Sequence, residues 1–104
     1  MDKAEAINKA IEFSNRAKQF FIFYRAVMFG SYVKGNTRLE SDIDIAFFVN
    51  DYNDNLDYYN LLVNLNKLAK EIDSRIEPHI FTDNSESGFS EIILSNCEEL
   101  PVVN

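Results

Sequence analysis

Residues 26–49 read AVMFGSYVKGNTRLESDIDIAFFV, with two apolar runs on either side of a short polar segment. The first run stops at Gly30, and its aromatic and β-branched residues predict a buried strand in the latter half of 20–29. The second run, 42–49, starts by alternating acidic and apolar residues, as a half-buried strand does. We therefore predict two strands joined by a turn over residues 31–41.

The flanking sequence predicts two helices and a third strand. Apolar residues recur at three- and four-residue spacing over 2–18 and 56–72, which indicates amphipathic helices. Residues 74–81 have the pattern of a strand, and Pro78 within it favours the edge of a sheet, since proline cannot donate a ladder hydrogen bond. We expect a short helix over 89–97 and a frayed end or contact tail over 98–104.

Length and charge limit the classes of function. A chain of 104 residues fits one compact domain, so we expect a single domain over 1–104. The net charge is −7, and residues 51–104 carry three Lys or Arg against eleven Asp or Glu. This balance argues against a broad nucleic-acid surface, which needs a basic face, and suits a divalent cation or a basic partner better.

The composition also bears on the cellular compartment. Cys97 is the one cysteine, so an internal disulfide is excluded, which fits a reducing compartment. The N-terminus lacks a basic-then-apolar signal pattern, and no apolar run approaches the roughly 20 residues that span a bilayer. We expect a cytoplasmic protein without a membrane partner.

The acidic pair at the start of the second strand predicts a metal site. Side chains two apart in a strand project from the same side, so Asp42 and Asp44 point together. Such a pair on its own is most simply a solvated strand end. Two adjacent carboxylates repel each other, however, and a bound Mg²⁺, which prefers oxygen ligands, removes this cost.

The segment upstream of the acidic pair has the residues of a phosphate site. Gly30 lets a phosphate approach the backbone closely, and Ser31 adds a hydroxyl donor where a helical turn exposes free N–H groups. Lys34 and Arg38 are candidates to balance the charge of a triphosphate, although loop cations of this kind are usually solvated.

If the chain performs chemistry on a phosphate with two metal ions, one to activate the attacking oxygen and one to hold the leaving phosphates, it needs a third carboxylate. Glu77, on the predicted third strand, is the candidate. His79 is two residues further and therefore on the same face, either at the rim of the site or as a partly buried strand residue.

Gly30-Ser31, Gly35 and Ser41-Asp42-Ile43-Asp44-Ile45 resemble the signature of the polymerase-β-like nucleotidyltransferases, in which Gly-Ser precedes Asp-x-Asp by ten residues. The resemblance is greatest to small stand-alone domains of the minimal nucleotidyltransferase type, such as MntA antitoxins encoded beside a HEPN-domain toxin. It implies an α/β fold, with a small mixed sheet of three or four strands and helices mainly on one face. The site would lie at the sheet edge where Gly30 and Asp42 meet.

The resemblance also implies a function. Asp42, Asp44 and Glu77 would bind two Mg²⁺ ions, while Gly30 and Ser31 would contact the triphosphate of ATP. The reaction would move AMP to an acceptor hydroxyl, on a HEPN-type partner encoded nearby. A non-catalytic nucleotide-binding module that neutralises its partner by docking remains the alternative, and a metal-binding subunit of a larger polymerase-like assembly is disfavoured by the acidic charge.

Overall fold

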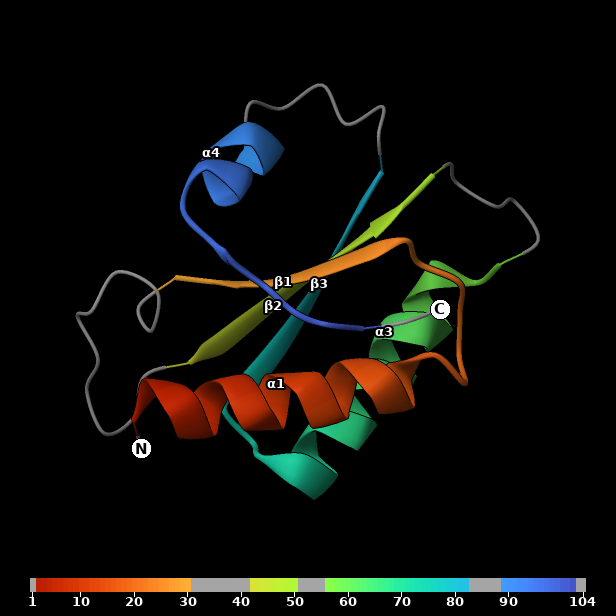
Figure 1. Ribbon diagram of the computed structural model, residues 1–104. Coiled ribbons are helices and arrows are strands. Elements are labelled where there is room, and N and C mark those ends of the chain that lie inside the picture. The colour runs from red at the N-terminus through yellow and green to blue at the C-terminus, as the bar shows by residue number, and fades with distance from the viewer. Residues whose placement is uncertain (1, 31–41, 51–55, 83–88, 103–104) are drawn as a thin grey trace.

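The computed structural model describes residues 2–30, 42–50, 56–82 and 89–102. Its sheet has four strands in the order β3-β2-β1-β4 (Figure 1). The strands are β1 (Arg25–Phe29), β2 (Ile43–Val49), β3 (Ile76–Thr82) and β4 (Glu98–Glu99). β2 is parallel to β3 and antiparallel to β1, which is also antiparallel to β4, so the predicted mixed α/β sheet is confirmed.

Two long helices cover one face of this sheet (Figure 1). α1 (Lys3–Ala17) is capped by Asp2, and α3 (Tyr58–Ile72) is capped by Asp57. Their buried sides pack against every second residue of β2, at Ile43, Ile45, Phe47 and Val49. Both helices lie within one or two residues of the predicted limits. Within the described part of the chain, no helix has both the length and the apolar character to cross a bilayer.

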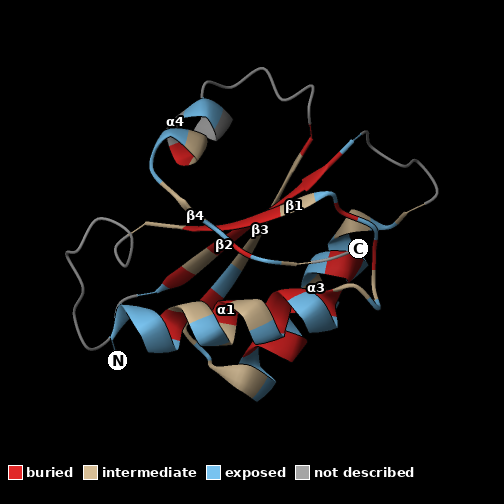
Figure 2. Cartoon of the chain, in the orientation of Figure 1, coloured by how far each residue is buried: buried red, intermediate tan, exposed pale blue. Residues whose placement is uncertain are grey.

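The opposite face of the sheet carries a smaller apolar cluster. Ala46 and Phe48 of β2 point to this side, together with Val27 of β1. The short helix α4 (Phe89–Ser95) lies over it and contributes Ile93 (Figures 1 and 2). β2 is therefore covered on both faces, and the helices pack mainly on one of them, as predicted.

The expectation of a frayed end or contact tail over 98–104 is wrong for its first residues. Glu98 and Glu99 form β4 beside Met28 and Val27 of β1, and Leu100 after them is buried. The acidic side chains pair with cations from distant parts of the chain, Lys3 with Glu98 and Arg25 with Glu99. Such pairing partners are not visible in a local sequence pattern, and a two-residue strand has no periodicity to detect.

The turn from α3 to β3 is fixed by the carboxylate of Asp73, whose side chain is only 7% exposed. Its oxygens accept hydrogen bonds from the backbone N–H and guanidinium of Arg75, at 2.8–2.9 Å, and from Lys9 Nζ of α1, at 2.7 Å. The hydrogen bonds from Arg75, followed by that from Lys9, hold the pKa of Asp73 well below its usual value. This carboxylate therefore joins α1, α3 and the start of β3.

We expect Asp73→Asn to lower the free energy of unfolding at pH 7 by about 1.5–3 kcal/mol, the range for hydrogen bonds to charged groups. A carboxyl with a depressed folded pKa stabilises the fold above its unfolded pKa of about 3.9, and this contribution is lost as the pH falls towards the folded value. Urea unfolding from pH 7 to pH 2.5 should show the two proteins converging in stability. The exposed Glu12→Gln, which makes the same change in charge, should stay within about 0.5 kcal/mol.

Candidate functional site

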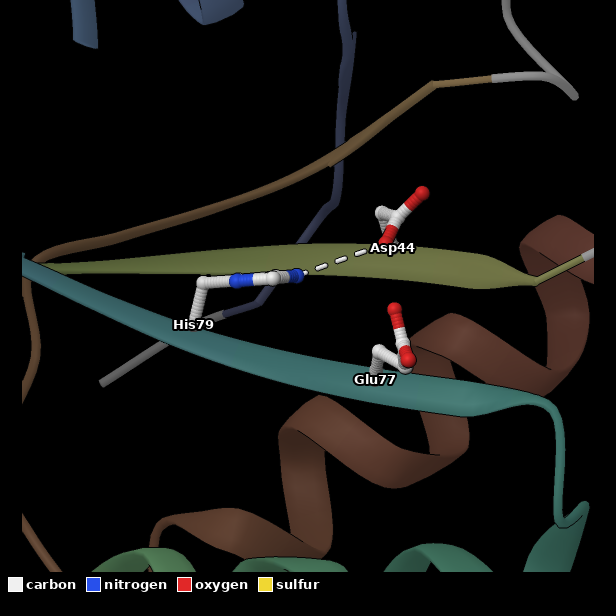
Figure 3. Close-up of side chains that lie close together, drawn as sticks. All are labelled: Asp44, Glu77 and His79. Carbon is white, nitrogen blue, oxygen red and sulfur yellow. Dashed lines mark hydrogen bonds and ion pairs between the residues drawn. The ribbon is translucent and has the colours of Figure 1, made fainter. Parts of the chain in front are cut away.

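Two carboxylates from neighbouring strands meet on the face of the sheet opposite α1 and α3. Asp44 of β2 lies directly beside Glu77 of β3 in the parallel register. Single ligand atoms of Asp44, Glu77 and His79 all lie within 4.8 Å of one another. Figure 3 shows the Glu77 carboxyl facing that of Asp44, with the imidazole of His79 pointing to the same place. Two of the three predicted acidic ligands are thus brought together.

His79 is held in place by contacts with the adjacent strand β2, with β1 beyond it and with its own strand. Its Nε2 lies 3.3 Å from Asp44 Oδ1, so a ring with its proton on Nε2 donates a hydrogen bond to the carboxylate. The ring packs against Phe29 of β1, at 5.3 Å between centroids, and Phe81 lies next along β3 at 6.5 Å. These contacts orient the imidazole, which in turn orients Asp44.

The electrostatics of the cluster act against holding all its carboxylates ionised. Burial, the negative charge of Asp42 and a hydrogen bond to Asp44 raise the pKa of Glu77 above its usual value, and the charge of Asp44 adds to this. The charge of His79 acts in the opposite direction. A cation at this position would therefore offset the repulsion between the carboxylates.

Asp42 lies directly before β2 and is exposed. It is not one of the three residues whose ligand atoms converge, but its charge reaches Glu77. Among the described acids, Asp44 and Glu77 therefore form the centre of the site, and Asp42 adds negative charge at its margin.

Gly30 is in direct contact with the centre of this site. Its φ is +86°, a conformation that residues with a side chain rarely adopt. A Cβ placed on Gly30 would lie 2.5 Å from Asp44 Oδ2, far inside van der Waals contact. The glycine therefore allows the end of β1 to approach the carboxylate. The prediction placed Gly30 beside Asp42, whereas the contact that the structure shows is with Asp44.

The other predicted phosphate contacts, Ser31, Lys34 and Arg38, lie outside the described residues, as does Gly35. His79, by contrast, belongs to the cluster although the sequence left its role open. Its two-residue spacing from Glu77 was the available signal, because it places both side chains on one face of the strand. The contact of His79 with Asp44, 35 residues away, needed the register of β2 against β3.

The chemistry of this donor set fits a hard divalent cation. Carboxylate oxygens are the ligands that Mg²⁺ prefers, and it is commonly held by one or two carboxylates together with substrate phosphates. Gly30, which lies against Asp44, has no side chain to keep a phosphate from the backbone. The arrangement can thus hold a metal ion against a phosphate ester.

Comparison with known proteins shows a family match and a shared fold. Residues 8–100 match the family described as Polymerase beta, Nucleotidyltransferase. A chain of a toxin–antitoxin crystal structure with AMP-PNP is similar at 26% identity and a TM-score of 0.62, over 94% of this chain and 74% of that one. No curated protein matches the chain.

A second similar chain comes from the structure of a complex between the tri-AMPylated Shewanella oneidensis HEPN toxin and an MNT antitoxin. The likeness has 24% identity and a TM-score of 0.56, and it covers 97% of this chain and 73% of that one. A third is the toxin–antitoxin pair MntA-HepT, at 23% identity and a TM-score of 0.54, over 96% and 73% of the two chains. At these identities the likeness establishes a shared fold.

We expect Gly30→Ala to lower stability by about 1–3 kcal/mol, the usual cost of a strained backbone conformation, and to weaken binding of a divalent cation by displacing Asp44. Gly30→Asn separates the two effects. Asparagine tolerates positive φ, so it should recover part of the stability, but its Cβ should disturb Asp44 just as much. Thermal unfolding and Mn²⁺ titration would measure both, and wild-type metal binding by both variants would contradict the steric argument.

We expect Glu77→Gln to stabilise the metal-free protein slightly. A carboxyl whose pKa is raised in the folded state stabilises the fold below its unfolded pKa. This contribution is lost as the pH rises through the folded pKa. The ionised carboxylate of Glu77 is therefore unfavourable for the fold at pH 7. The gain should not exceed about 1 kcal/mol, because water screens an exposed residue. Thermal unfolding at pH 7 should show a slightly higher melting temperature for the metal-free variant. Added Mg²⁺ should no longer stabilise this variant. The exposed Glu91→Gln serves as control, and a lower melting temperature for Glu77→Gln would refute the reasoning.

Proposed function

Because this chain belongs to the polymerase β nucleotidyltransferase family, we propose that it is a Mg²⁺-dependent adenylyltransferase that acts on a HEPN-type partner protein in the cytoplasm. The observation that carries the proposal is the pairing of Asp44 with Glu77 across β2 and β3, against the positive-φ Gly30. This pairing provides the oxygen ligands and the open backbone that a metal-bound triphosphate needs.

The site residues divide into two groups in this proposal. Asp42, Asp44 and Glu77 bind the metal, with two ions as in two-metal phosphoryl chemistry. Gly30, Ser31, Lys34 and Arg38 contact the phosphates of ATP. For Ser31 the support is the sequence together with the family resemblance, and for Lys34 and Arg38 it is their position in the sequence alone. His79 orients Asp44 through its hydrogen bond. Bound Mg²⁺ would neutralise the phosphates and polarise the reacting oxygens.

The reaction is the transfer of a nucleoside monophosphate. An acceptor hydroxyl oxygen forms a bond to the α-phosphorus of ATP, the bond from that phosphorus to the β-bridging oxygen breaks, and pyrophosphate leaves with release of the hydroxyl proton. The protein acts by positioning the two reactants and by matching the charge that develops.

The similar structures support the choice of acceptor. One of them holds an AMPylated HEPN toxin with its antitoxin, and another holds a toxin–antitoxin pair with the ATP analogue AMP-PNP. We extend both features to this chain, so that its partner is a HEPN-domain protein encoded nearby and its nucleotide is ATP. The modified partner would then be neutralised by the AMP group.

The test is a calorimetric titration of ATP into the protein with and without Mg²⁺, followed by transfer of labelled AMP to the purified HEPN-type partner. We expect Mg²⁺-dependent binding in the wild type, and its loss together with transfer in Asp44→Asn. Asp42→Asn and Glu77→Gln test whether the other two carboxylates are also needed for binding and transfer. Glu91→Gln is the charge-matched control. Neutralisation of the partner by every variant, without transfer, would instead identify a non-catalytic docking module.

A further inference from the structure

Helix α3 has a second stripe of residues besides the one that packs in the core. The core stripe consists of Leu61, Leu65, Leu68 and Ala69. The second stripe, here called the outer face of α3, consists of Tyr59, Leu62, Val63, Asn66, Lys67 and Lys70. Its spacing of three and four residues is that of one helix face, on the other side of the helix from the core stripe.

The outer face is apolar in its first half and exposed. Tyr59 is 77% exposed and Leu62 is 37% exposed, two of the large apolar side chains that the structure leaves in contact with water. The six residues line a shallow hollow of about 430 Å³. A solvated helix face is normally polar, so two exposed apolar side chains three residues apart on one face make it a candidate interaction surface.

The second half of the outer face is positively charged. Most described cations are paired with acids: Lys3, Lys9, Arg16, Arg25 and Arg75 all have carboxylate partners. Within the described ranges, Lys67 and Lys70 have no such partner, and no acidic residue lines the hollow beside them. Lys70 also lies in the last turn, where a cation suits the helix dipole, but that does not account for the apolar residues next to it.

We propose that the outer face of α3 binds an amphipathic helix of the partner protein, with apolar residues over Tyr59 and Leu62 and carboxylates at Lys67 and Lys70. Acidic residues are favoured in the first turn of a helix. The partner helix therefore runs antiparallel to α3, with its N-terminal turn at Lys70. The inference rests on the proposed function for the identity of the partner, and on the outer face for the mode of binding.

A second copy of this chain is a poorer occupant. An antiparallel pairing that matches the whole face to itself would place Lys67 opposite Leu62 and Lys70 opposite Tyr59, with no carboxylate for either ammonium. Each copy would also bring a net charge of −7, which opposes self-association. A different protein with a helix of the stated pattern satisfies both halves of the face.

The outer face lies away from the candidate site. α3 packs on the face of the sheet that carries Ile43 and Phe47, whereas Asp44 and Glu77 lie on the opposite face. A partner held on α3 leaves the carboxylates open to ATP. Binding of the partner and binding of the nucleotide can therefore be lost separately, which makes the inference testable apart from the proposed function.

The experiment measures the Kd of the purified HEPN-domain protein encoded nearby for the wild-type chain and for variants, with a titration of ATP and Mg²⁺ on each. We expect Lys67→Glu/Lys70→Glu to weaken partner binding by about 10-fold or more, and Tyr59→Ala to weaken it as well. Lys67→Arg/Lys70→Arg should retain affinity. Lys18→Glu reverses another lysine without a described ion pair, away from the outer face, and should stay near wild type.

Loss of partner binding in the charge-reversed variant, with ATP binding unchanged, would support the inference. Wild-type affinity in that variant and in Tyr59→Ala would overturn it and leave the proposed function standing. Failure of the wild type to bind this partner would overturn both the inference and the proposed acceptor, while ATP binding still reports on the site. A wild-type dimer that Lys67→Glu/Lys70→Glu makes monomeric would assign the outer face to a second copy, and would also overturn the inference.

Discussion

The register between β2 and β3 is the constraint on which the rest of the molecule depends. Ile43 lies beside Ile76 and Asp44 beside Glu77, so one face of the two strands is apolar and the other carries the carboxylates. Because side chains alternate along a strand, a slip of one residue in β3 would turn Glu77 towards the core and Ile76 towards the site. The core beneath Ile43 thus fixes the geometry of the acids above it.

The repulsion between Asp44 and Glu77 is thus held in place by the packed core on the other face of the sheet. The two carboxylates at the site repel each other, and burial adds to the cost of ionising Glu77. Around them the chain is held by strong contacts, with Asp73 joining three elements and the ring of Phe47 packed against those of Phe13, Phe21 and Phe23. The packing on one face therefore maintains a charge arrangement on the other that would not persist by itself.

Local sequence patterns predicted the elements that have enough residues to show a period. The three- and four-residue spacing predicted α1 and α3, and the alternation from Asp42 onwards predicted β2 and the face on which Asp44 lies. Glu77 was predicted to join the acidic pair from the needs of two-metal chemistry and again from the family resemblance. β4 was missed because two residues have no period, and the contact of His79 with Asp44 was not assigned because it depends on strand register. The placement of Ser31, Lys34 and Arg38 stays a prediction.

Pro78 has a consequence for the solubility of the folded chain. It occupies the edge strand β3 between Glu77 and His79, where a proline fits only with its nitrogen on the solvent side. An intermolecular strand added along this edge would lack a hydrogen-bond donor there and would meet the charge of Glu77 close by. The strand that supplies the third carboxylate is thereby also protected against the edge-to-edge association through which sheets aggregate.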